Sequence, residues 1–145
     1  MSLEWKDSYE VGHHEIDAQH QVLYELANKF LNASDKISSA NSGMSLYKYT
    51  RGHFKYEENL MKKLGYPEME MHIAQHTDLI SLLNEVAENV ADESLSMQDL
   101  EAFLSAWLID HISSSDTKLA FYVQLQHQGS AHDHTGEAGR FADFE

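Results

Sequence analysis

The chain has no cysteine, which excludes disulfides, thiolate metal sites and iron–sulfur clusters. It has one proline, Pro67, and seven glycines in 145 residues, a composition that suits long helices better than many short strands. No apolar run approaches the roughly 18–20 residues of a membrane-spanning helix. The N-terminus has no basic region followed by an apolar one, so we expect neither a transmembrane segment nor a secretory signal, and a cytoplasmic protein.

Basic residues are also scarce, with 10 Lys and Arg against 24 Asp and Glu and a net charge of −14. Such a chain repels polyanions and anionic lipid surfaces, so we expect neither nucleic-acid binding nor membrane binding. At 145 residues, 42% of them hydrophobic, the chain is long enough for one core and too short for two ordinary domains.

Apolar residues recur at three- and four-residue steps in four stretches, the period of an amphipathic α-helix. The predicted helices are 16–33, 44–64, 67–91 and 97–126. The Ser- and Asn-rich segment 34–43 is predicted to be a connection, and 127–145 a flexible polar tail. Short connections predict an all-α, antiparallel up-down-up-down four-helix bundle spanning 1–126, including an N-terminal arm over 1–15.

Several single residues predict local features of this bundle. Gly65 is placed to end the second helix in a left-handed conformation, and Pro67 fits the first turn of the third. Ser96 is placed to cap the fourth helix. We expect Trp5 and Tyr9 to attach the arm to the body of the bundle.

Seven polar residues fall on faces predicted to point inwards. They are His20, His53, Glu57, His72, His76, His111 and Asp116. A lone histidine on an apolar face is more often a hydrogen-bonded core residue than a ligand. Seven such groups from four helices need partners, because each buried polar group without one costs about 1–3 kcal/mol of stability. A metal centre satisfies all of them together.

The spacing of these residues agrees with a metal centre. His53 and Glu57 are four residues apart and therefore point to the same side of one helix, as do His72 and His76. A single pair of this kind is a weak signal, because surface helices contain it by accident. Two pairs on consecutive helices are more specific.

His111 and Asp116 do not share a face on a regular helix. Five residues turn about 500°, which leaves the two side chains about 140° apart. If both are ligands, the fourth helix must widen locally, and we predict a π-bulge near 113–115.

The number and type of donors indicate two metal ions. A zinc site needs about four ligands, and magnesium or calcium prefers oxygen. Two octahedral ions offer about twelve positions, of which five histidines, two bridging carboxylates and one shared oxide or hydroxide fill about eleven. One position stays open for a small ligand. A histidine-rich centre stabilises high oxidation states less than a carboxylate-rich one, which favours reversible O2 capture over oxidation of an organic substrate.

Five segments together resemble a known family. They are Ile16-Asp-Ala-Gln-His20, His53-Phe-Lys-Tyr-Glu57-Glu-Asn-Leu-Met61, Gly65-Tyr-Pro67, His72-Ile-Ala-Gln-His76 and Trp107-Leu-Ile-Asp-His111-Ile-Ser-Ser-Ser-Asp116. In combination they are similar to the hemerythrins, specifically the bacterial ones, over roughly residues 5–122. The tail beyond about residue 127 has no counterpart in this pattern.

The resemblance implies a non-heme di-iron oxygen carrier on a four-helix bundle, its two iron ions bridged by oxide or hydroxide. By position, His72, His76 and His111 would hold one iron, His20 and His53 would hold the iron with the open position, and Glu57 and Asp116 would bridge. Four apolar residues match family positions that line the oxygen pocket, and they also fit ordinary bundle core: Phe54, Trp107, Leu108 and Ile112.

The leading interpretation is a binding protein rather than an enzyme, with O2 as ligand, serving oxygen storage, transport or delivery to an unidentified recipient. The first alternative is an O2 or redox sensor read by a separate partner chain. The second is a di-iron enzyme acting on peroxide, nitric oxide or iron. No substrate pocket or proton relay stands out in the sequence beyond the ligands, which ranks the enzyme last.

Overall fold

The computed structural model describes residues 2–129 and, within that range, all side chains except those at 111, 128 and 129. Three rods are single helices: α1 (His14–Leu31), α2 (Lys36–Leu64) and α3 (Met69–Ala91). The fourth consists of α4 (Met97–Ser105), the π-helical segment η2 (Ala106–Ser113) and α5 (Ser114–Gly129). A short 3-10 turn, η1 (Asp7–Tyr9), precedes them.

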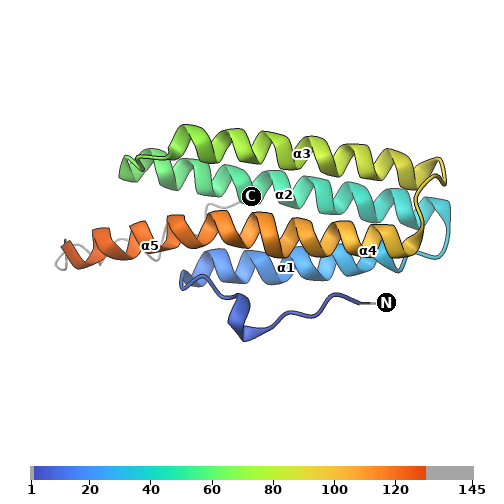
Figure 1. Cartoon of the computed structure of the whole chain (residues 1–145), viewed down its shortest axis with the longest axis horizontal. Coiled ribbons are helices and arrows are strands. Elements are labelled where there is room, and N and C mark those ends of the chain that lie inside the picture. The colour runs from blue at the N-terminus through green and yellow to red at the C-terminus, as the bar shows by residue number, and fades with distance from the viewer. Residues whose placement is uncertain (1, 130–145) are drawn as a thin grey trace.

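The four rods run antiparallel to their neighbours in sequence, and the chain passes up and down the molecule in order (Figure 1). The part of the chain that the structure describes contains no β-strand. These features confirm the all-α four-helix bundle. Across residues 2–129, no helix combines the length and hydropathy that crossing a bilayer requires.

The beginning of α2 differs from the prediction, because most of the segment 34–43 is helical rather than a connection. The Asp35 carboxylate caps the helix by accepting a hydrogen bond from the backbone N–H of Ser38 at 2.7 Å. Gly43 is buried, and a Cβ atom there would lie 3.1 Å from the ring of Phe30 on α1. Close packing between the two helices and a well-formed cap therefore outweigh the weak helix propensity of serine and asparagine.

The remaining helix ends follow the local signals closely. Gly65 adopts the predicted left-handed conformation with φ of 65° and ends α2. The Ser96 hydroxyl accepts a hydrogen bond from the backbone N–H of Asp99 at 3.0 Å, which caps α4 as predicted. Pro67 lies in the turn before α3, whose first residue is Met69, so its predicted place inside the first helical turn is wrong. Local signals thus locate these ends to within about two residues.

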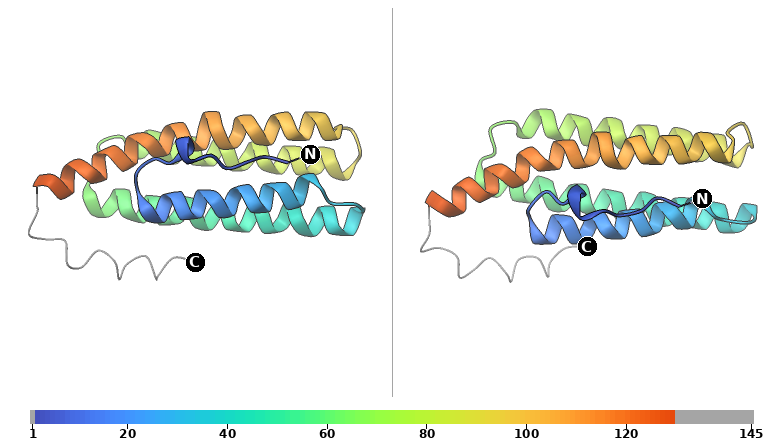
Figure 2. Two further views of the ribbon diagram at one scale, coloured as in Figure 1. Left: turned by 90° about the horizontal axis from the view of Figure 1, so that it is seen from below. Right: turned by 60° about the horizontal axis from the view of Figure 1, so that its bottom comes forward.

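The N-terminal arm lies along the outside of the bundle, over α1 and the fourth rod (Figure 2). Trp5 meets the ring of Tyr24 on α1 edge-on at 5.4 Å between centroids, and Tyr9 stacks on Tyr24 at 5.9 Å. The backbone of Leu3 exchanges two hydrogen bonds with the Asn28 side chain, at 2.6 and 2.7 Å. These contacts confirm that the arm is attached through its aromatic residues.

At the other end of the chain, α5 continues to Gly129, so residues 127–129 are helical rather than part of a tail. The rest of the predicted flexible tail, 130–145, lies outside the described residues.

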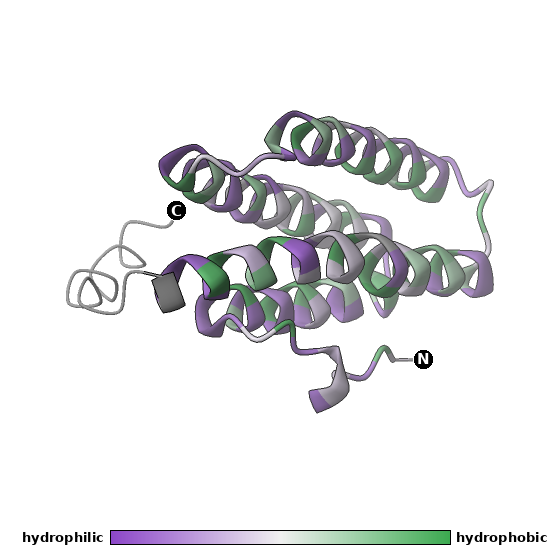
Figure 3. Ribbon diagram, turned by 60° about the vertical axis from the view of Figure 1, so that its left-hand side comes forward, coloured by the Kyte–Doolittle hydropathy of each residue, from purple (hydrophilic) through white to green (hydrophobic). Residues whose placement is uncertain are grey.

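The buried interior consists of two apolar clusters. Figure 3 shows hydrophobic and hydrophilic positions alternating around the rods, as expected for amphipathic helices. The larger cluster includes Leu23, Phe54, Leu83, Leu104 and Trp107, and the smaller comprises Ile16, Met61, Tyr66, Leu119 and Val123. On every rod, a set of buried polar residues falls between the members of the two clusters.

Candidate metal centre

The polar layer between the two clusters contains six of the seven residues predicted as ligands. Each of the six residues is at most 4% exposed. The six are His20 on α1, His53 and Glu57 on α2, His72 and His76 on α3, and Asp116 on α5. The backbone of the seventh, His111, lies in η2, and its side chain is outside the described part of the structure.

These six residues form two overlapping donor sets. In each set, one potential ligand atom per residue lies within 4.8 Å of the others. The first set is His20, His53, Glu57 and Asp116, and the second is Glu57, His72, His76 and Asp116. Both sets contain the same two carboxylates, so two neighbouring cations could share them.

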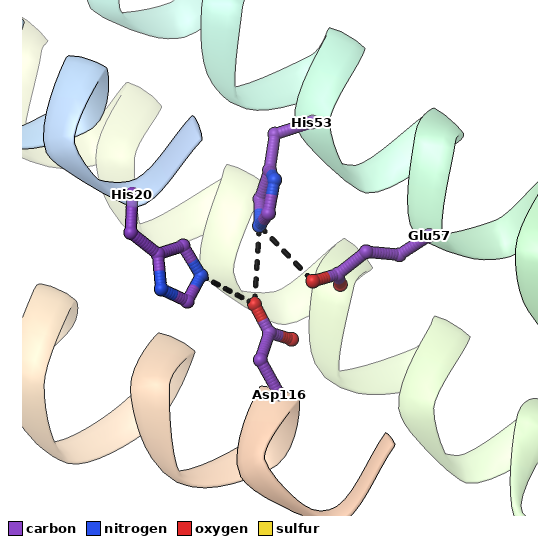
Figure 4. Close-up of side chains that lie close together, drawn as sticks. All are labelled: His20, His53, Glu57 and Asp116. Carbon is purple, nitrogen blue, oxygen red and sulfur yellow. Dashed lines mark hydrogen bonds and ion pairs between the residues drawn. The ribbon is translucent and has the colours of Figure 1, made fainter. Parts of the chain in front are cut away.

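In the first set, the side chains of His20 and His53 both contact Asp116 (Figure 4). The Nε2 atom of His20 lies 2.6 Å from Asp116 Oδ2, and the Nε2 atom of His53 lies 3.1 Å from the same oxygen. His53 Nε2 is also 3.1 Å from Glu57 Oε2. Both imidazoles thus direct Nε2 at carboxylate oxygens in the interior.

The second set uses the other oxygens of the same carboxylates. His72 Nε2 lies 3.3 Å from Glu57 Oε1 and 3.3 Å from Asp116 Oδ1. His76 Nε2 lies 3.0 Å from Glu57 Oε1. Each carboxylate therefore presents one oxygen to each donor set, which is the arrangement of a bridging ligand.

Burial and charge act in opposite directions on the ionisable groups of the layer. Burial lowers the pKa of His53, but Glu57 and Asp116 outweigh it and raise this pKa to about 10. The pKa of His72 rises to about 9 for the same reasons. Burial disfavours an ionised Asp116, yet the hydrogen bonds it receives, among them those from His20 and His53, hold its pKa well below the usual range. Without a cation, protons on His53 and His72 therefore offset the charge of the two carboxylates.

Two buried atoms of the layer test whether metal ions fit there. Among the described residues, His20 Nδ1 and Glu57 Oε2 have no hydrogen-bond partner, although His53 Nε2 lies 3.1 Å from Glu57 Oε2 as an ion pair. A cation on the Glu57 oxygen would satisfy one of these two atoms. Four imidazoles with two carboxylates suit iron and similar transition metals, and they suit magnesium or calcium poorly. The donor set therefore fits a pair of transition-metal ions.

The widening predicted for the fourth rod exists but lies earlier than expected. The π-helical segment covers Ala106–Ser113 instead of 113–115. The Ser113 hydroxyl donates a hydrogen bond to the carbonyl oxygen of Leu108, five residues before it, at 3.0 Å. The wider turns change the rotation of everything that follows, and Asp116 reaches the polar layer.

The four residues predicted to line an oxygen pocket all belong to the larger apolar cluster. Phe54 stacks flat on His76, with ring centroids 3.8 Å apart and planes 4° apart. The indole of Trp107 donates a hydrogen bond to a backbone carbonyl of α3 at 3.1 Å. Leu108 and Ile112 are at most 2% exposed. All four are thus buried, and Phe54 places an apolar ring directly against His76.

Two residues that contact the layer were given no role in the prediction from sequence. His53 Nδ1 lies 2.6 Å from the Gln19 amide oxygen, and His76 Nδ1 lies 2.9 Å from a carboxylate oxygen of Glu58. Gln19 and Glu58 each stand next to a predicted ligand in the chain. An imidazole that binds a metal through one nitrogen needs an acceptor for the N–H of the other. A search for such acceptors near the predicted histidine ligands could have found Gln19 and Glu58.

The chain is similar in sequence to proteins of one family. Residues 11–121 match the family model described as Hemerythrin HHE cation binding domain. A bacteriohemerythrin of Stenotrophomonas maltophilia (strain R551-3) is 30% identical over 141 residues, which cover 91% of this chain and 88% of the relative. A bacteriohemerythrin of Pseudomonas aeruginosa (strain LESB58) is 32% identical over 79% of this chain and 76% of its own length. A myohemerythrin of Theromyzon tessulatum is 27% identical over 79% and 88%.

Proposed function

The chain belongs to the hemerythrin family, and from this we propose that it binds O2 reversibly at a non-heme di-iron centre, for oxygen storage, transport or delivery. The proposed ligands are His20, His53, Glu57, His72, His76, His111 and Asp116. Glu57 and Asp116 would bridge the two iron ions, together with an oxide or hydroxide.

The observation that carries this proposal is the orientation of the two carboxylates. Asp116 directs Oδ2 at His20 and His53 and Oδ1 at His72. Glu57 divides its oxygens between the two sets in the same way. A single-ion site has no use for such a division, whereas two adjacent ions need it.

The bound iron pair supplies the electrons that hold O2, and the chain's own residues make that binding reversible. Phe54, Trp107, Leu108 and Ile112 keep water away from one side of the layer, because apolar walls offer it no hydrogen bonds. The amide oxygen of Gln19 holds the His53 ring in place through Nδ1. The same apolar wall gives an organic substrate no polar group to bind, which favours a carrier over an enzyme.

A cycle of reduction and oxygenation tests the proposal. The purified chain is reduced without oxygen, exposed to O2 and then degassed, while the iron-to-ligand absorption is followed. We expect two iron ions per chain and full return to the colourless state. Irreversible oxidation coupled to a product would support an enzyme instead, and a chain without iron would refute the proposal.

A pair of histidine variants tests the ligand assignment within the same helix. His20→Ala removes a proposed ligand of the first set, and we expect it to hold that one iron ion more weakly and to lose O2 binding, while the iron of the second set is retained. His14→Ala removes an exposed histidine from the same helix and should bind both as the unmodified chain does. Unchanged iron content together with unchanged O2 binding in His20→Ala would contradict the assignment.

A further inference from the structure

The two donor sets differ in what stands behind their imidazoles. In the second set, the Nδ1 atom of His76 meets the carboxylate of Glu58 at 2.9 Å. In the first set, the Nδ1 atom of His53 meets only the neutral amide of Gln19 at 2.6 Å. The amide nitrogen of Gln19 in turn donates to Glu15 at 2.9 Å, so a carboxylate stands one step further away.

The other imidazole of the first set, His20, has no acceptor behind it among the described residues. His20 Nδ1 is buried and has no hydrogen-bond partner among the described residues. An imidazole whose N–H donates to a carboxylate is a stronger electron donor than one whose N–H is unpaired or meets a neutral amide. His76 is therefore a stronger nitrogen donor than either imidazole of the first set.

The two sets also differ in their access to solvent. A small polar cavity of about 80 Å³ lies between α3 and α5 and includes His72 in its wall. Gln75, Ser115 and Lys118 line it as well, and the Ser115 hydroxyl donates to the Gln75 side chain at 2.7 Å. His20 and His53 do not line this cavity, and they are at most 1% exposed. One imidazole of the second set thus borders a polar cavity.

We infer that the two cation positions are unequal: the position formed by Glu57, His72, His76 and Asp116 takes its ion first and holds it more tightly, with Glu58 as the positioning residue. This inference rests on the proposed two-metal site. Glu58 acts through His76, because it orients that ring and adds a negative charge next to an incoming dication. The Glu58 side chain is 33% exposed, so the Glu58→Gln substitution does not leave an unpaired charge in the interior.

Cobalt(II) titration of the metal-free chain tests the inference without any oxygen chemistry. Two dissociation constants are measured by competition with a chelator, with the cobalt absorption spectrum as a second readout. Glu58→Gln should weaken the tighter constant roughly 10–100-fold and leave the weaker one in place. Asp78→Asn makes the same charge change at an exposed site on α3 and should alter neither.

A single-position background removes any coupling between the two ions. His20→Ala disables the first set, so the remaining tight site reports on the second set alone. Adding Glu58→Gln to that background should again cost roughly 10–100-fold in cobalt affinity. Circular dichroism of each variant verifies that the bundle is folded.

The reciprocal exchange moves a carboxylate behind His53. The double variant Glu15→Gln with Gln19→Glu keeps the net charge and should tighten the weaker constant. Equal constants in the unmodified chain, or a Glu58→Gln variant that binds cobalt unchanged in the His20→Ala background, would overturn the inference and leave O2 binding intact. Binding of fewer than two ions by the unmodified chain would count against the two-metal site itself.

Discussion

The stability of the metal-free chain should fall as the pH rises from about 6.5 to about 10. His53 has a pKa of about 10 in the folded chain and His72 a pKa of about 9, against about 6.5 in the unfolded chain. Between these limits, the folded chain holds protons that the unfolded chain has already released. The stabilisation is therefore complete below pH 6.5 and is lost as the pH passes through the folded pKa values.

The size of this effect follows from the number of protons retained. Each one lowers the free energy of unfolding by roughly 1–1.5 kcal/mol per pH unit while the unfolded histidine is neutral and the folded one is charged. With iron bound, the imidazoles are neutral ligands, and this slope should disappear. The contrast between the two forms separates the metal layer from the rest of the molecule.

Urea unfolding at pH 6.5, 7.5 and 8.5, followed by circular dichroism, measures the slope for the metal-free and iron-loaded chains. Replacing both residues, His53→Gln with His72→Gln, should flatten it, and the exposed His14→Ala should leave it unchanged. A metal-free chain whose stability rises or stays constant over this range would refute the reasoning.

Three other substitutions test the packing of the bundle. Ile112→Ser puts a hydroxyl in the apolar wall and should speed irreversible oxidation of the oxygenated form, measured by absorption, more than Leu119→Ser in the smaller cluster. Gly43→Leu forces a side chain against Phe30 and should cost about 1–3 kcal/mol in urea unfolding, whereas the exposed Ser45→Leu should cost little. Leu104→Ala, at a fully buried site, should cost about 2–5 kcal/mol in the same assay, and a value near zero would contradict the burial.

The local parts of the fold and the site were predictable because they depend on neighbours along the chain. Helical periodicity located four rods, and Gly65 and Ser96 marked two of their ends. Four-residue spacing placed His53 beside Glu57 and His72 beside His76 without any knowledge of the other helices. In each case, the geometry of one helix was sufficient.

Long-range packing settled what periodicity left open. The segment 34–43 became largely helical because Gly43 allows α2 to meet Phe30 on α1, a contact that no local propensity encodes. The π-helical segment begins earlier in the fourth rod than predicted, since its position depends on how that rod packs against its neighbours.

Only the tertiary structure fixes the alignment of one rod against the next, and this alignment brings the proposed ligands together. It brings Asp116 between the two histidine pairs, so that each carboxylate oxygen faces a different donor set. The acceptors behind the imidazoles, Gln19 and Glu58, come from the same alignment. Spacing along one helix specifies which residues share a face, whereas contacts between helices depend on how far each slides and turns against the next.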